Sequence, residues 1–99
     1  MYARVTKITG GSPEQAEQGI ADFRNNALPG VKELGARGAM LLIDRQSGEG
    51  MAITLWEDEA AMRTSEEQAS ELRRAAVQAL GSTEEPRVER YEVAVFETD

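Results

Sequence analysis

Hydrophobic positions along the chain follow two spacings: every second residue in some segments, and every third or fourth residue in others. Residues 2–9 alternate and are rich in Val, Ile and Thr, which predicts a β-strand. A Gly-Gly pair at 10–11 ends it, and the Ser-Pro-Glu-Gln sequence at 12–15 is typical of a helix start. Apolar residues then recur every three or four positions, and Leu-Pro-Gly at 28–30 predicts the end of this helix.

The second half of the chain follows a related order. Residues 39–43 form a continuous apolar run and residues 51–56 return as a strand after a Gly-containing turn, which together predict a β-hairpin. A second helix is predicted from the acidic residues at 57–59 to Gly81, and a last strand at 87–97. The order β-α-β-β-α-β matches the ferredoxin-like α+β arrangement, an antiparallel sheet with both helices on one face. We expect a single domain over residues 1–99.

Such a sheet normally exposes its second face, so the division of its residues between the two faces matters. The side chains expected to face the helices are Ala3, Val5, Leu41, Ile43, Ile53, Leu55, Tyr91, Val93 and Val95. The opposite face would then carry Arg4, Thr6, Met40, Leu42, Ala52, Thr54, Trp56, Arg90, Ala94 and Phe96. Its Met, Leu, Trp and Phe side chains would form a patch too large to leave in water. We therefore expect two copies to pair face to face as a homodimer.

The composition excludes several kinds of catalytic and metal-binding site. The chain has no His and no Cys, so it lacks the commonest general base, the thiol nucleophile and the usual transition-metal ligands. We expect no metal and no cofactor. A net charge of −7 without a basic stripe disfavours nucleic acid as a partner. No stretch is long and apolar enough for a membrane span or signal peptide, so we expect a cytoplasmic protein without a membrane partner.

Element order and local sequence together resemble the dimeric α/β-barrel superfamily, and within it the antibiotic-biosynthesis-monooxygenase-like (ABM-like) proteins. The resemblance spans nearly the whole chain. The segment Thr-Leu-Trp-Glu-Asp-Glu-Ala-Ala-Met at 54–62 is similar to the exit of the third strand in that group, and Tyr-Ala-Arg-Val-Thr at 2–6 and Val-Glu-Arg-Tyr-Glu-Val at 88–93 also fit. One departure is that many members place a His soon after the position of Met62, where this chain has Arg-Thr-Ser-Glu at 63–66.

The resemblance implies two functions, which stay open at this point together with a third possibility, a structural or regulatory dimer without a ligand. One is binding of an apolar or planar small molecule by an ABM-like homodimer. The alternative is a cofactor-independent monooxygenase acting on an aromatic or polyketide-like substrate; without His, its base would be a carboxylate, a Tyr or water. A haem-degrading role that needs an axial His is disfavoured.

The single Trp, Trp56, could stack on a planar ligand, but an anchor at the dimer interface is the simpler interpretation. Arg4 and Arg90 could clamp an anionic ligand, although pairing with Glu92 or Glu57 is simpler, because a buried Arg needs a partner.

The remaining candidates lie mainly on the helices. Ser65 could hydrogen-bond a ligand, or it could cap a helix restart, since Thr-Ser-Glu-Glu at 64–67 resembles a capping box and predicts a break there. Asn25 could orient a carbonyl, or serve the turn at the helix end. The full set of candidate ligand-binding residues is Trp56, Arg4, Ser65, Asn25, Tyr91, Phe23 and Met62, of which Phe23 and Met62 are most simply core.

Overall fold

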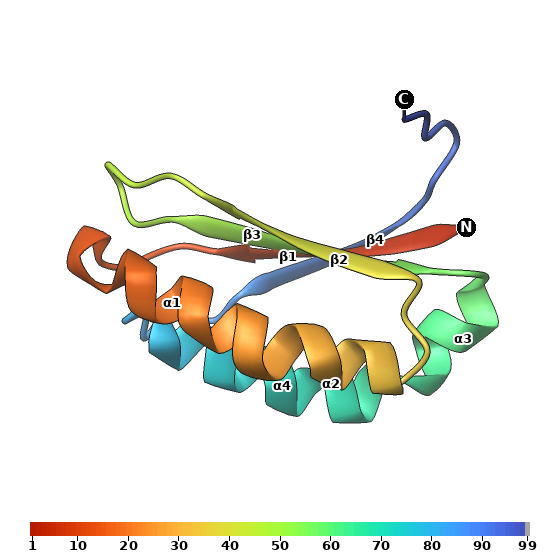
Figure 1. Ribbon diagram of the computed structural model, residues 1–99, viewed down its shortest axis with the longest axis horizontal. Coiled ribbons are helices and arrows are strands. Elements are labelled where there is room, and N and C mark those ends of the chain that lie inside the picture. Colours follow the sequence, from red (N-terminus) through yellow and green to blue (C-terminus); the bar gives the residue numbers. More distant parts are fainter. Residues whose placement is uncertain (99) are drawn as a thin grey trace.

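The structure, a computed structural model, describes residues 1–98 and confirms the ferredoxin-like α+β fold (Figure 1). Its four-stranded antiparallel sheet has the order β2-β3-β1-β4. Each β1 residue from Tyr2 to Lys7 faces one partner on β3 and one on β4, so β1 is an inner strand of the sheet. The strands are β1 (Tyr2–Ile8), β2 (Gly38–Ile43), β3 (Gly50–Trp56) and β4 (Arg87–Glu92).

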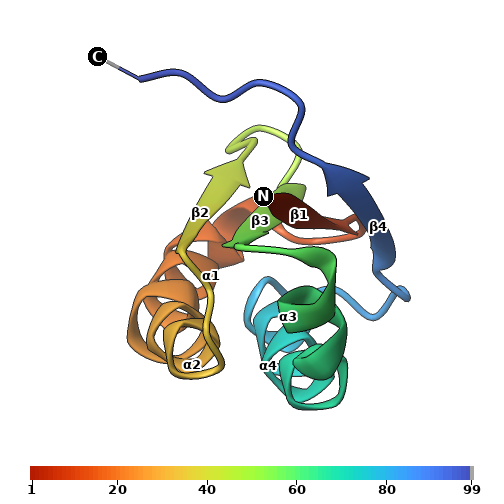
Figure 2. The same ribbon diagram turned by 90° about the vertical axis from the view of Figure 1, so that its right-hand side faces the viewer.

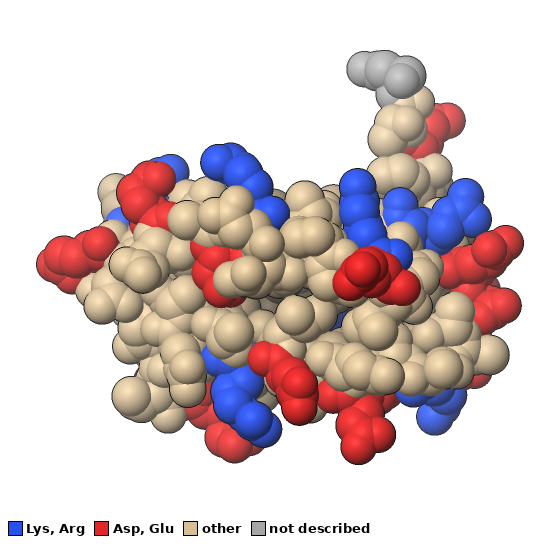
Figure 3. Space-filling model, turned by 60° about the horizontal axis from the view of Figure 1, so that its bottom comes forward, with Lys and Arg blue, Asp and Glu red and all other residues tan. Residues whose placement is uncertain are grey.

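All helices cover one face of the sheet, in two rows that lie side by side and run in opposite directions (Figures 1 and 2). The row after β1 consists of a 3-10 turn (Pro13–Gln15), α1 (Ala16–Asp22), a π-helical turn (Phe23–Ala27) and α2 (Leu28–Glu33). The row after β3 consists of α3 (Glu59–Thr64) and α4 (Glu66–Ala79). On the face shown in Figure 3, acidic and basic side chains are interspersed, so this side offers no continuous basic surface to a phosphate backbone.

The first helical row does not end at residues 28–30 as predicted. The chain instead widens into the π-helical turn, and the Leu28 N–H donates to the Phe23 carbonyl, five residues back. Pro29 then occupies the first turn of α2, where its missing N–H is tolerated. The proline therefore changes the pitch of the helix rather than stopping it, since a π-turn rearranges the local hydrogen-bond ladder.

The predicted break near Ser65 is confirmed, because α3 ends at Thr64 and α4 begins at Glu66. Asp58 caps α3, accepting a hydrogen bond from the Ala61 N–H at 2.8 Å. Ser65 makes no capping hydrogen bond, so the interpretation of this serine as a cap is wrong. Its side chain instead accepts a hydrogen bond from Arg4 of β1.

The expected division of the sheet faces is wrong on three of the four strands. Arg4, Thr6 and Trp56 lie under the helices and are buried, although the helix-free face was expected to carry them. The register places Leu41 of β2 opposite Ala52 of β3, so these two share the helix side, and only the β2 assignments are confirmed. The helix-free face therefore carries, among others, Ala3, Val5, Met40, Leu42, Ile53, Leu55 and Tyr91.

This reversal leaves the helix-free face more apolar than expected. Met40, Leu42 and Tyr91 keep 39%, 47% and 51% of their surface exposed. The last strand is shorter than the predicted 87–97: β4 ends at Glu92, and the following segment leaves the sheet on its helix-free side (Figures 1 and 2). Val95 and Phe96 are exposed on this segment.

Candidate functional site

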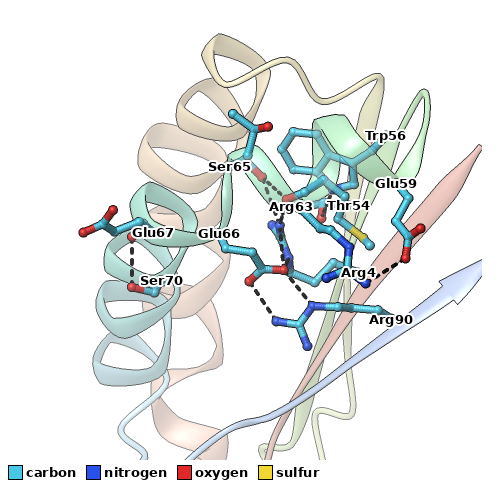
Figure 4. A network of polar contacts seen from close by, with 12 residues as sticks. Arg4, Thr54, Trp56, Glu59, Arg63, Ser65, Glu66, Glu67, Ser70 and Arg90 are labelled. Carbon is cyan, nitrogen blue, oxygen red and sulfur yellow. Dashed lines mark hydrogen bonds and ion pairs between the residues drawn. The ribbon is translucent and has the colours of Figure 1, made fainter.

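The side chain of Arg4 enters the space between the sheet and the second helical row (Figure 4). It is only 3% exposed. Its Nη2 donates to the Met62 carbonyl at 2.6 Å and to Ser65 Oγ at 2.9 Å, and its Nε donates to Glu66 Oε1 at 3.3 Å. Because α3 stops at Thr64, the carbonyl and the hydroxyl at this break are free to meet the guanidinium. The helix break therefore supplies hydrogen-bond acceptors for the buried guanidinium, and the guanidinium supplies donors to the break.

Trp56 lies against Arg4 and has no exposed surface. Its Nε1 donates to Thr54 Oγ1 at 2.9 Å, and the Arg4 Cζ lies 5.1 Å from the centroid of the indole ring, within the range of a cation–π contact. Val31 and Met62 pack in the same apolar cluster. Trp56 is therefore a core residue of one subunit, and its interpretation as a dimer-interface anchor is wrong.

Arg4 and Arg90 do converge on a carboxylate, but the carboxylate belongs to Glu66. Arg90 faces Arg4 across β1 and β4 and binds both Glu66 oxygens, at 2.6 and 2.8 Å. These hydrogen bonds from Arg90, with the charge of Arg4, hold the pKa of the Glu66 carboxyl below its ordinary value. The expected pairing with Glu92 or Glu57 is replaced by this contact, and both arginines already have an anionic partner.

Next to this network, a cavity lies between the sheet and the two helical rows. It offers about 40 Å³ to the centres of water molecules, which is room for a few waters. Its wall is mostly apolar, with two arginines and two threonines. The lining residues are Arg4, Thr6, Ile8, Phe23, Ala27, Val31, Ala52, Thr54, Ala69, Leu72, Arg73 and Ala76.

Arg73 of α4 is a polar residue of this wall that lacks a hydrogen-bond partner in the described part of the chain. Its Nη2 is buried without a hydrogen-bond partner, and it makes no salt bridge within residues 1–98. Burial lowers the pKa of the Arg73 guanidinium, and the positive charge of Arg4 lowers it further. Sequence reasoning did not select Arg73. A signal was present, however, because Arg73 interrupts the apolar stripe of Ala69, Leu72 and Ala76.

The seven candidate residues fall into three groups. Arg4 and Phe23 line the cavity. Trp56, Ser65 and Met62 are buried beside it in the polar network and the core, and are not part of its wall. Asn25 is exposed on the π-helical turn and Tyr91 is half-exposed on the helix-free face, so the structure brings neither to the cavity.

The cavity wall favours binding over proton transfer. None of its lining residues is a carboxylate or a tyrosine, and the neighbouring Glu66 is held ionised between two arginines, which makes it a weak base. Within residues 1–98, no cluster of three or more Asp, Glu, His or Cys could hold a metal ion. No helix in the same part of the chain has the length and apolar character needed to cross a membrane. The arrangement can surround an apolar body and offer N–H and O–H donors.

Comparison with known proteins gives two kinds of similarity. No family model matches the chain. The chain is similar over its whole length to two Mycobacterium tuberculosis (strain H37Rv) proteins described as uncharacterized, Rv2557 at 38% identity and Rv2558 at 40%. It spans 43% and 41% of their lengths, respectively, so each relative is more than twice as long as this chain.

Solved structures identify the class of fold. The ActVA-Orf6 monooxygenase of Streptomyces coelicolor, in complex with nanaomycin D, superposes with a TM-score of 0.73 at 16% identity, over 98% of this chain and 92% of that one. A putative antibiotic biosynthesis monooxygenase from Deinococcus radiodurans has a TM-score of 0.67 at 16% identity, over 100% and 98%. A mutant of SnoaB, a cofactor-independent oxygenase from Streptomyces nogalater, has 0.59 at 25%, over 99% and 97%. The chain has the ABM-like fold, which confirms the resemblance at that level.

Proposed function

We propose that the protein binds a small, largely apolar or planar organic molecule in the cavity between its sheet and its helices. The observation that carries this proposal is the cavity itself. It is lined by one subunit, opens partly to solvent, has a mostly apolar wall and holds a few convergent polar groups, which is the usual character of a small-molecule site. An aromatic ring needs more room than a few waters, so binding includes rotation of lining side chains such as Phe23 and Leu72.

The comparisons support the same class of ligand. The Streptomyces coelicolor monooxygenase of the same fold is described in complex with nanaomycin D, an organic ligand. The structures do not transfer an activity to this chain, because fold alone does not determine chemistry. They make an organic ligand a specific hypothesis to test in this cavity.

The test is a titration with planar phenolic compounds, followed by Trp56 fluorescence and calorimetry. Trp56 contacts Arg4 and donates to Thr54, which both line the cavity, so a ligand there changes the surroundings of the indole. Filling the cavity with Ala76→Leu is expected to weaken binding at least about tenfold, since it removes room for the ligand. The matched control Ala75→Leu adds the same side chain at an exposed position of α4 and should bind like wild type. Absence of binding by wild type, or equal binding by both variants, would exclude this site.

A cofactor-independent monooxygenase is the second candidate, favoured by the description of SnoaB, the neighbour with 25% identity. Arginines in the wall could stabilise the oxyanion of a substrate that ionises readily. The missing base restricts this activity to such acidic substrates. Oxygen consumption with an anthrone-type substrate would support it, whereas binding without oxygen consumption would leave the binding function alone.

We further propose that two copies pair through their helix-free sheet faces as a homodimer. Met40, Leu42 and Tyr91 expose a third to a half of their surfaces on this face, beside half-buried Ile53 and Leu55. A contiguous apolar sheet face of this kind is normally covered by a partner, and self-pairing across a two-fold axis covers both copies at once.

Leu42→Glu is expected to convert the dimer to monomers at micromolar concentration, because it places a charge among the exposed apolar side chains of the proposed interface. The control Gln68→Glu adds the same charge to an exposed position of α4 on the opposite side of the molecule and should leave the dimer intact. Sedimentation equilibrium measures both. A monomeric wild type, or a dimer that Leu42→Glu leaves unchanged, contradicts the proposed interface.

A further inference from the structure

Positive charge exceeds negative charge around the cavity, although the whole chain carries a net charge of −7. Three arginines lie on this side of the sheet, Arg4, Arg73 and Arg90, and Glu66 is the carboxylate that pairs with two of them. Arg90 occupies both Glu66 oxygens, and Arg4 shares one of them. Glu66 therefore has little capacity left for a third guanidinium, and Arg73 makes no salt bridge within residues 1–98.

The Arg73 side chain is half-buried, but its Nη2 is buried without an acceptor among the described residues, and a buried N–H of this kind is costly, so proteins usually pair it. Arg73 lies on α4 with aliphatic neighbours along the same stripe, where Leu or Met would complete the apolar face. The arginine instead leaves a buried N–H without an acceptor at a cavity wall. This unpaired N–H destabilises the protein without ligand and faces a cavity. A group with both properties is more typical of a ligand-binding contact than of a contact that stabilises the fold.

We propose that the ligand of this cavity is an organic anion whose carboxylate or comparable planar oxyanion binds to Arg73. This inference rests on the proposed function and specifies its ligand class. The guanidinium presents parallel N–H groups that match a carboxylate, and such charge-assisted hydrogen bonds are among the strongest in proteins. The apolar part of the molecule lies against the aliphatic and aromatic side of the wall, toward Phe23 and Ala27.

A second donor lies on the sheet side of the same cavity. Thr54 Oγ1 accepts the hydrogen bond of the Trp56 Nε1, which leaves the hydroxyl proton of Thr54 free to donate. Arg4 contributes positive charge but has committed its Nη2 and Nε to Met62, Ser65 and Glu66. Arg73 is therefore the residue that determines specificity for an anion, and Thr54 an auxiliary donor.

The test compares 2-naphthoate with its neutral isostere 2-naphthamide, by calorimetry at constant ionic strength. Wild type should bind 2-naphthoate about 10- to 100-fold more tightly than the amide, the range expected for a hydrogen bond to a charged group. Arg73→Met should remove this preference and leave the affinity for the amide within about threefold of wild type. The control Arg74→Met removes a positive charge from the next, exposed position of α4 and should keep the preference.

Two other results separate this inference from the proposed function. Equal binding of both probes to wild type overturns the anion preference and leaves small-molecule binding in place. If neither probe binds, both proposals fail, and the unpaired N–H is then explained by water in the cavity.

Thermal denaturation without ligand gives an independent readout. Arg73→Met should raise the Tm by about 4 °C, because it removes a buried N–H that lacks an acceptor and keeps an apolar side chain of similar length. A lower Tm, together with loss of both probes, would show that Arg73 stabilises the fold, and would overturn the inference.

Discussion

Replacing Trp56 by alanine is expected to lower the free energy of unfolding by about 3–5 kcal/mol, the range for large-to-small changes of buried aromatic residues. The indole has no exposed surface and packs with Val31 and Met62 in an apolar cluster of the subunit. The substitution also removes the donor to Thr54 Oγ1 and the ring beneath Arg4. All three losses occur within one subunit.

The matched variant Trp56→Phe separates packing from polar contacts. It keeps an aromatic ring against Arg4 but loses the N–H, and should cost about 1–3 kcal/mol, because the partner hydroxyl of Thr54 stays buried. Urea denaturation measures both variants. A cost below about 1 kcal/mol for Trp56→Ala would contradict the placement of Trp56 in the core.

Arg4→Met is expected to cost about 3–5 kcal/mol, the range for removing one member of a buried ionic group. The guanidinium is the hydrogen-bond partner that joins β1 to the break between α3 and α4, through the Met62 carbonyl and Ser65 Oγ. Its removal leaves the Met62 carbonyl with the Ser65 hydroxyl as its remaining side-chain donor, leaves Ser65 Oγ without the hydrogen bond it accepts, and leaves Arg90 as the cation that pairs with Glu66. Helices α3 and α4 should then be held less firmly against the sheet.

The control for Arg4→Met is Arg90→Met. Arg90 binds the same carboxylate, but its side chain is 42% exposed, so its removal should cost about 1 kcal/mol or less. Urea denaturation again gives the two values. Equal costs for the two arginines would show that the Glu66 ion pairs, and not the buried contacts to Met62 and Ser65, determine the contribution of Arg4.

Most of the fold follows from local sequence signals. The strand at 2–9, the hairpin at 39–56 and the helix break at Ser65 each have a local signature, and the structure confirms them. The first helix was predicted too short, because Pro29 reads as a helix end unless the preceding turn widens into a π-helix. That widening depends on packing against the sheet and α4, which a local pattern does not contain.

The faces of the sheet were harder to predict, for a physical reason. Alternation shows which residues share a face, but both faces of this sheet carry apolar side chains, so the pattern does not show which face the helices cover. The more apolar set on β1 and β3 was assigned to the helices, and the structure places it on the helix-free face instead. The register of β2 against β3 decides this, since Leu41 lies opposite Ala52.

The same reversal explains the candidate site. Arg4 and Trp56 were selected as candidates from their residue types, but were expected on an open face, and they lie under the helices. Arg73 was not selected, because a single arginine on a helix usually reaches solvent. Arg73 is unusual because it lacks an ionic partner within residues 1–98. This lack depends on residues far apart in the sequence, since the nearby carboxylate at the start of α4 already pairs with arginines of β1 and β4.

The most direct test of the account is an NMR titration of the alanine methyl groups with 2-naphthoate or its amide. Ala27, Ala52, Ala69 and Ala76 line the cavity, whereas Ala3 lies on the helix-free face of the same sheet. A ligand between sheet and helices should shift the four cavity methyl signals and leave the Ala3 signal in place. Shifts at Ala3 with unchanged cavity methyl signals would place the ligand on the opposite face and contradict the account.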